Sequence, residues 1–236
     1  MISIGIVGIT GKVGRNLCTQ LLDHPDIILI WGVSSSLIEK EDPLLKLYPS
    51  LTITTLDKAD FSQVDIIVDF STASISHDVI QKTWAHNKKL IMGTTGLSDQ
   101  DFAMMKKAAE EIPILYSPNF SPGIQIFIKL MAQVYALSQP ADVTISETHH
   151  IEKKDTPSGT AIMLASHLPH LAPISSKRSE SNVGEHTMTF HFKGETLSIS
   201  HQALSRDLFS LGVIKALYFM EQTPPKLYTF SDLYES

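Results

Sequence analysis

The stretch Ile2-Ser3-Ile4-Gly5-Ile6-Val7-Gly8-Ile9-Thr10-Gly11-Lys12-Val13-Gly14 decides the fold class of this chain. Its first half is a short run rich in β-branched residues, which is typical of a buried parallel strand. Three glycines then follow at Gly-x-x-Gly-x-x-Gly spacing, ahead of a helical pattern that reaches about Leu22. Such glycines let the backbone turn sharply and approach a pyrophosphate, which rests on the helix N-terminus. The stretch predicts a dinucleotide-binding turn, and a tight turn without a ligand is the alternative.

Strand and helix patterns alternate from this stretch to Tyr116, which indicates βαβ units and a parallel sheet. The strand patterns cover 27–33, 51–54, 64–70, 89–92 and 112–116, and the helical patterns cover 74–87 and 98–111. Ligands of such sheets bind beyond the carboxyl ends of the strands. We therefore expect the ligand at the loops 8–14, 34–36, 70–72, 93–96 and 117–121.

The second half of the chain has a different pattern. A turn-rich break at 117–123 predicts a hinge, and apolar residues at helical spacing then predict a helix over 124–135. Two β-prone runs on either side of Gly194 predict a hairpin. The remaining expectations are a strand from 142, a polar surface loop over 170–184, a helix over 205–220 and a tail over 222–236. The fold class is α/β, with an N-terminal Rossmann-like parallel sheet domain and a central mixed α/β domain.

Composition and charge exclude several functional classes. With 43% hydrophobic and 19% charged residues, the 236-residue chain is typical of globular proteins. Its net charge of −6 argues against nucleic acid or an anionic membrane as the main partner. We expect neither a membrane span nor a signal peptide. Cys18 is the single cysteine, so no intrachain disulfide forms, and we expect a cytoplasmic protein.

The densest group of reactive side chains lies at 147–160, Glu-Thr-His-His-Ile-Glu-Lys-Lys-Asp-Thr-Pro-Ser-Gly-Thr, between a strand pattern and a helical one. A zinc site is one interpretation, but adjacent histidines seldom converge on one ion and no third histidine stands at ligand spacing. A solvated charged loop is the second. In the third, imidazole and ammonium groups deliver a proton while the helix start binds a carboxylate. In a regular strand His149 and His150 point to opposite faces, so both serve one site only if the strand has ended or bulged there.

The end of the second predicted strand bears on the choice of cofactor. NAD-specific folds usually place a carboxylate there to bind the adenosine ribose. This chain has Ser34, Ser35 and Ser36 instead, with Lys12 in the glycine turn nearby. No carboxylate repels a 2′-phosphate, so the pattern favours NADPH, with NADH as the other possible cofactor.

The motif Glu-x-His-His-x-x-Lys-x-Asp-x-Pro-Ser-Gly-Thr-Ala resembles the signature of the 4-hydroxy-tetrahydrodipicolinate reductase (dihydrodipicolinate reductase) family of bacterial lysine and diaminopimelate synthesis. Further matching segments are Asp69-Phe70-Ser71, Gly93-Thr94-Thr95-Gly96, Asn119-Phe120-Ser121, Gly184-Glu185-His186-Thr187 and Ser205-Arg206. The resemblance implies NAD(P)H-dependent reduction of 4-hydroxy-tetrahydrodipicolinate to tetrahydrodipicolinate with release of water. It also implies a Rossmann domain over 1–120 and 206–236, and a substrate-binding and tetramer-forming domain over 121–205. The expected partners are a small dicarboxylate and further copies of the chain in a homotetramer.

The resemblance also assigns roles to individual residues. His149 matches the proton donor and Lys153 a second proton carrier. The substrate contacts are His150, Gly159 and Thr160, and Ser158 joins them. The matching cofactor contacts are Gly8, Ile9, Thr10, Gly11, Lys12, Val13, Phe70, Gly93, Thr94, Thr95, Ser117, Pro118, Asn119 and Phe120. Ser34 and Ser35 are expected contacts from the serine pattern alone, because the family often has an acid at the end of this strand. No metal is expected, and the alternatives are a non-catalytic NADP-binding regulatory module and a reductase of another imine or amino-acid substrate.

Overall fold

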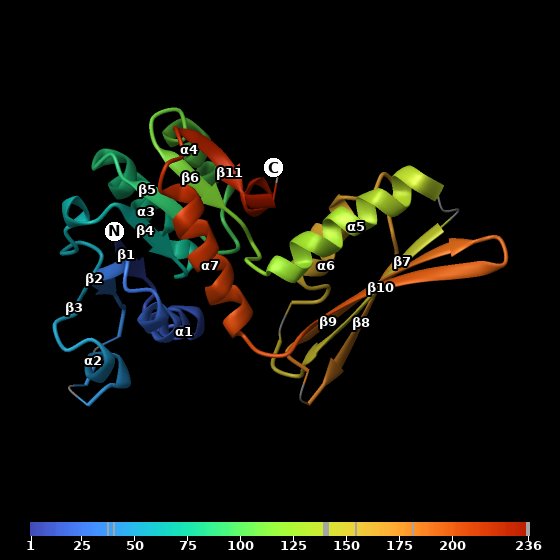
Figure 1. Cartoon of the computed structure of the whole chain (residues 1–236), viewed down its shortest axis with the longest axis horizontal. Helices are drawn as coiled ribbons and strands as arrows, with labels where there is room; N and C mark the ends of the chain where they lie inside the picture. Colours follow the sequence, from blue (N-terminus) through green and yellow to red (C-terminus); the bar gives the residue numbers. More distant parts are fainter. Residues whose placement is uncertain (37, 40, 139–141, 154, 181, 235–236) are drawn as a thin grey trace. The chain divides into compact units, whose positions relative to one another are not determined.

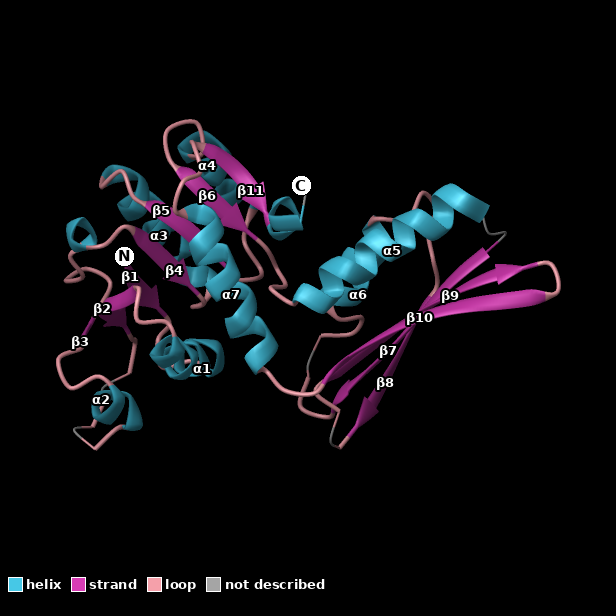
Figure 2. Ribbon diagram, viewed as in Figure 1, coloured by secondary structure: helices cyan, strands magenta, loops and turns pink. Residues whose placement is uncertain are grey.

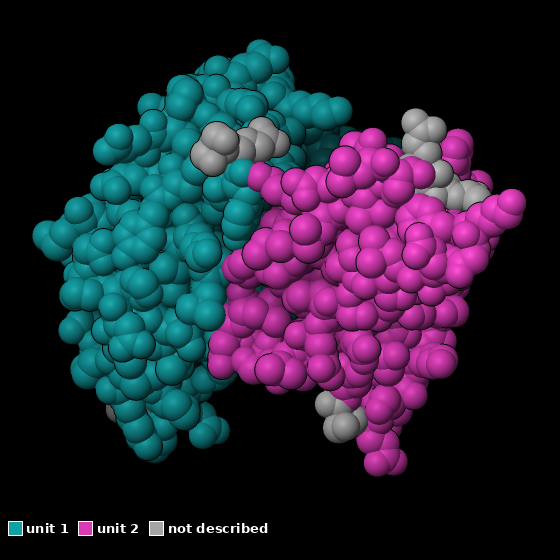
Figure 3. Space-filling view, turned by 45° about the vertical axis from the view of Figure 1, so that its right-hand side comes forward, with its two compact units in different colours: residues 1–120, 209–236 teal, residues 121–208 magenta. Residues whose placement is uncertain are grey.

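The computed structural model describes residues 1–36, 38–39, 41–138, 142–153, 155–180 and 182–234. The chain divides into two compact units. Unit 1 comprises Met1–Phe120 and Phe209–Ser236, and unit 2 comprises Ser121–Leu208 (Figure 3, teal and magenta). Within the described part of the chain, no helix combines the length and the apolar character needed to cross a bilayer.

Unit 1 is built on a seven-stranded, entirely parallel sheet (Figures 1 and 2). The strands are β1 (Ile2–Val7), β2 (Ile27–Val33), β3 (Thr52–Thr54), β4 (Ile66–Asp69), β5 (Lys89–Met92), β6 (Pro113–Tyr116) and β11 (Lys226–Thr229). Their order across the sheet is β11-β6-β5-β4-β1-β2-β3. The order reverses between β1 and β4, which is the arrangement of a doubly wound dinucleotide-binding fold.

Helices cover both faces of this sheet. One apolar cluster joins the β1 residues Ile4 and Ile6 to α1 (Lys12–Gln20) and α7 (Asp207–Met220). A second cluster, on the other face, includes residues of α3 (Ala73–Ala85) and α4 (Asp99–Ala108). The strands read as continuous apolar runs because both of their faces are buried. The short elements are α2 (Pro43–Leu47), η1 (Leu21–Asp23), η2 (Phe61–Gln63) and η3 (Phe230–Tyr234).

Unit 2 contains a four-stranded mixed sheet in the order β10-β9-β7-β8. Its strands are β7 (Asp142–His150), β8 (Ile174–Ser179), β9 (Gly184–Phe192) and β10 (Glu195–Ala203), and its helices are α5 (Pro122–Ser138) and α6 (Gly159–Ser166). Both helices contribute to an apolar cluster with β7 and β9, and so pack on one face of the sheet. The predicted hairpin is confirmed as the antiparallel pair β9–β10, with Gly194 at φ +91° in its turn.

Three sequence expectations need correction. The segment 170–184 contains the strand β8, which pairs in parallel with β7. It is polar because it lies at the edge of the sheet, where alternate side chains face solvent. The tail contains β11, which pairs with β6. Between the strand patterns 27–33 and 51–54, where no helix was predicted, the chain forms α2, and the Asp42 side chain caps it by accepting from the Leu44 N–H. The fold class itself is confirmed.

Candidate active site

Strand β7 carries the first part of the site. Its alternating pattern buries Val143, Ile145, Glu147 and His149 on one face. The first two residues pack in the apolar cluster under α5 and α6. The buried face therefore changes from apolar to ionisable at Glu147, which is 1% exposed, while His149 is 6% exposed. Buried ionisable groups are costly unless they have partners, so such a change marks a candidate functional site.

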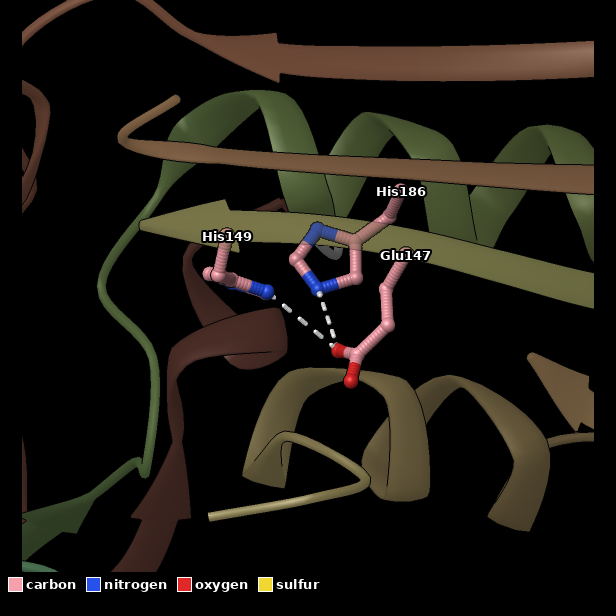
Figure 4. Close-up of side chains that lie close together, drawn as sticks. All are labelled: Glu147, His149 and His186. Atoms are coloured by element: carbon pink, nitrogen blue, oxygen red, sulfur yellow. Dashed lines mark ion pairs between the residues drawn. The ribbon is translucent and has the colours of Figure 1, made fainter. Parts of the chain in front are cut away.

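Strand β9 brings a second imidazole to the same place. His186 pairs in register with Glu147 and is 4% exposed. The Glu147 Oε2 atom lies 3.5 Å from His149 Nδ1 and 3.7 Å from His186 Nε2 (Figure 4). The two imidazole rings lie edge to face, with centroids 5.0 Å apart and planes at 73°. One carboxylate oxygen thus faces two rings at once.

The other carboxylate oxygen ties three elements together. Glu147 Oε1 accepts hydrogen bonds from the Ser158 backbone N–H at 3.0 Å and the Ser176 hydroxyl at 2.7 Å. Ser158 is the N-cap of α6, where its Oγ accepts from the Ala161 N–H at 3.1 Å. Glu147 therefore links its own strand to β8 and to the start of α6, which fixes the position of the carboxylate.

The pKa values follow from burial and these contacts. Burial raises the pKa of Glu147, but the hydrogen bonds from Ser158 and Ser176 outweigh it and leave the pKa below its ordinary value. Burial lowers the pKa of His149, and the Glu147 charge opposes that effect in part. Burial, assisted by the charge on His149, lowers the pKa of His186 to about 4. At neutral pH Glu147 is therefore ionised and His186 is neutral.

The spacing argument against a metal site missed His186. Ligand atoms of Glu147, His149 and His186 all lie within 4.8 Å of one another. His186 is far from the histidine pair in sequence, and only the pairing of β7 with β9 brings it close. Sequence spacing alone therefore does not exclude a third ligand.

The loop after β7 is held by Arg178 of β8. Its guanidinium donates to the carbonyl oxygens of Lys153 at 3.3 Å and Asp155 at 2.6 Å. The Lys153 ammonium forms an ion pair with the Asp155 carboxylate at 2.9 Å. Arg178 fell within the segment expected to be a loop, so its role was missed. In β8 one isoleucine is followed by five polar residues, so no alternating pattern in the sequence could have revealed the strand.

The other predicted substrate residues are separated by the strand and the turn. Strand β7 continues to His150, so His150 leaves the strand on the face opposite His149. The Ser158 N–H and hydroxyl both contact partners within unit 2. Gly159 is the first residue of α6, and the space beside its Cα is open. Thr160 is half-buried in the first turn of the same helix.

In unit 1 the predicted cofactor residues gather at the carboxyl edge of the sheet, because each follows a parallel strand. Gly8 has φ +83°, and a Cβ there would lie 2.5 Å from the Phe70 carbonyl oxygen, so the turns after β1 and β4 lie against each other. Thr94 donates to the buried Asp69 carboxylate at 2.8 Å, which links the turns after β4 and β5. Ile9 and Phe120 are fully buried, so of these two only the backbone can meet a ligand.

A pocket of about 490 Å³ lies beyond β2 and β3. Its apolar lining includes Leu45, Leu51 and Ile53, and its polar lining includes Ser34 and Lys58. The Ser34 hydroxyl lies 3.0 Å from that of Thr10, so the pocket is connected to the glycine turn. An apolar wall for a base, beside hydroxyls and an ammonium, suits the adenosine end of a dinucleotide.

One unit has a parallel sheet whose strand order reverses beside a glycine turn. The other unit has a buried carboxylate that faces two imidazoles. This is the architecture of a two-domain dinucleotide-dependent oxidoreductase. The family model described as "Dihydrodipicolinate reductase, N-terminus" matches residues 2–120. The model described as "Dihydrodipicolinate reductase, C-terminus" matches residues 123–234. The chain belongs to the dihydrodipicolinate reductase family.

Named relatives agree with this assignment. The 4-hydroxy-tetrahydrodipicolinate reductase of Rickettsia rickettsii (strain Sheila Smith) is 33% identical, with 100% of both chains covered. That of Thermosipho africanus (strain TCF52B) is also 33% identical, over 97% of this chain and 96% of the relative. Among solved structures, the dipicolinate-bound dihydrodipicolinate reductase from Paenisporosarcina sp. TG-14 has a TM-score of 0.78 at 20% identity, with 97% of both chains covered. A putative myo-inositol dehydrogenase from Sinorhizobium meliloti 1021 has a similar fold, with a TM-score of 0.67 at 10% identity over 92% of this chain and 88% of the other.

Proposed function

We propose that this chain catalyses the NAD(P)H-dependent reduction of 4-hydroxy-tetrahydrodipicolinate to tetrahydrodipicolinate, with release of water, in lysine and diaminopimelate biosynthesis. The family and the names of its members support this activity and do not favour the two alternatives. One structural observation carries the proposal. The buried His149 and the braced Lys153 lie at the end of β7, in a chain whose other unit bears a dinucleotide-binding turn.

The chemistry divides between the two units. The 4-hydroxyl group leaves as water, and the dinucleotide, when bound, would supply a hydride to the resulting conjugated ring. The reduced ring is then electron-rich, like an enamine, and needs a proton, which we assign to His149 with Lys153 as the second carrier. We assign the substrate carboxylates to Gly159 and Thr160 at the start of α6. The resemblance adds Ser158 and His150, but Ser158 is bonded within unit 2 and His150 lies on the face of β7 opposite His149, so neither carries this assignment. This assignment is supported by the open space beside the Gly159 Cα and by the positive end of the helix dipole, which suits an anion. Closure of the units on the substrate would exclude water during the transfer.

We assign dinucleotide binding to the turns at the carboxyl edge of the parallel sheet and propose NADPH as the preferred cofactor. The pocket beyond β2 and β3 supports this preference, since Ser34, Ser35 and Lys58 are among the residues that line it. Lys12 is exposed at the start of α1 and could add a second positive charge. A 2′-phosphate requires cationic and hydroxyl partners of this kind.

Replacing Lys58 by alanine should raise the KM for NADPH about tenfold, because one charged contact to the 2′-phosphate is lost. The KM for NADH should stay the same, since that cofactor lacks the phosphate. Steady-state KM values for both cofactors measure the effect. Lys106→Ala, an exposed lysine on α4, is the matched control. Equal KM values for NADPH in the Lys58 variant and the wild type would place the phosphate elsewhere.

Replacing Arg178 by alanine should lower kcat/KM about ten- to hundredfold, because the loop that carries Lys153 loses its anchor and small misplacements are costly. The KM for NADPH should not change. Lys177→Ala removes the preceding, exposed cation of β8 and serves as control. Wild-type kcat/KM in the Arg178 variant would show that the loop keeps its position without this anchor.

The direct test of the function is the loss of NADPH absorbance when enzymatically made 4-hydroxy-tetrahydrodipicolinate is added. Rapid oxidation is expected. Cofactor binding without any turnover would support a regulatory module, and faster turnover of an imine with one carboxylate would support a different reductase.

We further propose a homotetramer in the cytoplasm, a dinucleotide-binding domain over 1–120 and 206–236, and a substrate-binding domain over 121–205. The tetramer is supported by the face of the unit 2 sheet opposite α5 and α6. There, hydroxyls pair across β9 and β10, Thr187 with Ser200 at 2.8 Å and Thr189 with Ser198 at 3.0 Å. Light scattering should give four times the 26.1 kDa chain mass, and cell fractionation tests the compartment.

A further inference from the structure

We propose that Glu147 is the positioning residue of the proton donor, and that its buried carboxylate orients the His149 ring through Nδ1 and stabilises that ring in its positively charged form. This inference rests on the proposed function for its catalytic part. Its structural part, the coupling of Glu147 to His149, concerns unit 2 alone and is measurable without turnover.

The Glu147 carboxylate is held in a fixed position. Glu147 is 1% exposed, and its Oε1 atom accepts hydrogen bonds from both Ser158 and Ser176. Its Oε2 atom, together with His149 Nδ1, has no hydrogen-bond partner within the described part of the chain. These two unpartnered atoms are buried and face each other at 3.5 Å. A shift of a few tenths of an ångström would form a charge-assisted hydrogen bond, and catalytic contacts often tighten in this way when substrate binds.

Gly184 lies beside the edge of the His149 ring that carries Nε2. A Cβ built on Gly184 would lie 3.1 Å from His149 Nε2 and 3.2 Å from Cδ2. Only a glycine at this position leaves that edge of the ring uncrowded. Glu147 therefore faces Nδ1, and the missing side chain of Gly184 keeps a Cβ away from Nε2, the nitrogen to which we assign the proton transfer. The proton passes to the reduced ring, and His149 remains as neutral imidazole until solvent protonates it again.

Several ionisable groups surround the His149 ring. The groups that face His149 are Glu147 on its own strand, Lys153 and Asp155 in the following loop, Arg178 on β8 and His186 on β9. Burial is the largest factor that lowers the pKa of His149, and Glu147 is the largest that raises it. His186 remains neutral at pH 7 because its pKa is about 4. Glu147 therefore favours the charged form of His149, while Arg178, whose Nη1 atom lies 4.0 Å from Glu147 Oε1, is a second positive charge beside the carboxylate.

The test compares Glu147→Gln, which removes the charge but keeps an oxygen for the Ser158 N–H, with Ser176→Ala, which keeps the charge. The His149 ring is titrated by NMR, with its signal assigned from a His149→Asn variant. In Glu147→Gln the pKa of His149 should fall by about one pH unit, because an opposite charge within reach is lost. In Ser176→Ala it should stay at the wild-type value.

Turnover provides the second measurement. A donor must be protonated, so kcat falls as pH rises through its pKa, and in Glu147→Gln this decline should move to lower pH by the same amount. We expect kcat at pH 8 to fall at least about tenfold with the KM for NADPH unchanged. Glu147→Asp, which withdraws the charge by one methylene, should give an intermediate shift and decides the question if Glu147→Gln fails to fold.

Two results would overturn the inference: an unchanged His149 titration in both Glu147 variants, or a shifted titration with a wild-type pH profile of kcat. A wild-type protein that binds NADPH but does not turn over would refute the proposed function instead. In that case the NMR titration would still decide whether Glu147 controls His149.

Discussion

Replacing His149 by alanine should lower kcat by about 10²–10⁴-fold while NADPH binding is retained. The loss is large because His149 is the imidazole to which we assign the proton, with the Glu147 carboxylate facing its Nδ1 atom and a glycine beside its Nε2 atom. His186 should be a poor substitute, since burial and the neighbouring His149 charge lower its pKa to about 4. NADPH binding should persist because the glycine turn belongs to unit 1. Steady-state kinetics and calorimetric titration with NADPH measure the two quantities.

His167→Ala is the control for this experiment, because His167 lies exposed at the end of α6 and should be dispensable. Its kcat should equal that of the wild type. If His149→Ala also turned over at nearly the wild-type rate, the proton would have to come from another group, and Lys153 would be the next to replace.

Replacing Gly212 by alanine should lower the free energy of unfolding by about 3 kcal/mol. A Cβ added at Gly212 would overlap the carbonyl oxygen of Phe120, which is backbone and cannot rotate away. The gain in helix propensity from glycine to alanine, about 1 kcal/mol, is too small to compensate. Thermal unfolding followed by circular dichroism should show a midpoint lowered by about 10 °C.

Gly159→Ala is the matched control for stability, because nothing lies within 4 Å of a Cβ built there. Its midpoint should stay within about 2 °C of the wild type. A Gly212 variant that melts with the wild type would mean that α7 shifts on the sheet at little cost.

The main features of the fold could be predicted because local patterns and tertiary structure agree. Buried strands such as β1 and β4 are mostly apolar, and the glycine turn marks the start of α1. The missed elements lack such patterns. Strand β8 is rich in serine and basic residues, and α2 has only five residues and depends on its Asp42 cap. Strand β11 is short and forms by pairing with β6, which is distant in sequence.

The candidate site was predictable only in part, for a similar reason. The motif around His149 and Lys153 is continuous in sequence, so its residues could be identified together. Their partners come from other strands: His186 from β9, and Ser176 and Arg178 from β8. The alternation of side chains along β7 then separates His149 from His150, which sequence adjacency could not settle.

Unit 1 is assembled from two segments of the chain that are far apart in sequence, and this affects folding during synthesis. The ribosome delivers residues 121–208 before α7 and β11 emerge, yet the cluster around Ile4 and Ile6 needs Val213, Leu217 and Phe230 to be covered. While the ribosome translates unit 2, the nascent chain therefore carries an incomplete sheet, and one apolar face of that sheet is not yet fully covered. Unit 1 is thus the first unit to be synthesised and the last to complete its fold. Chaperones that shield apolar surfaces would act during that interval.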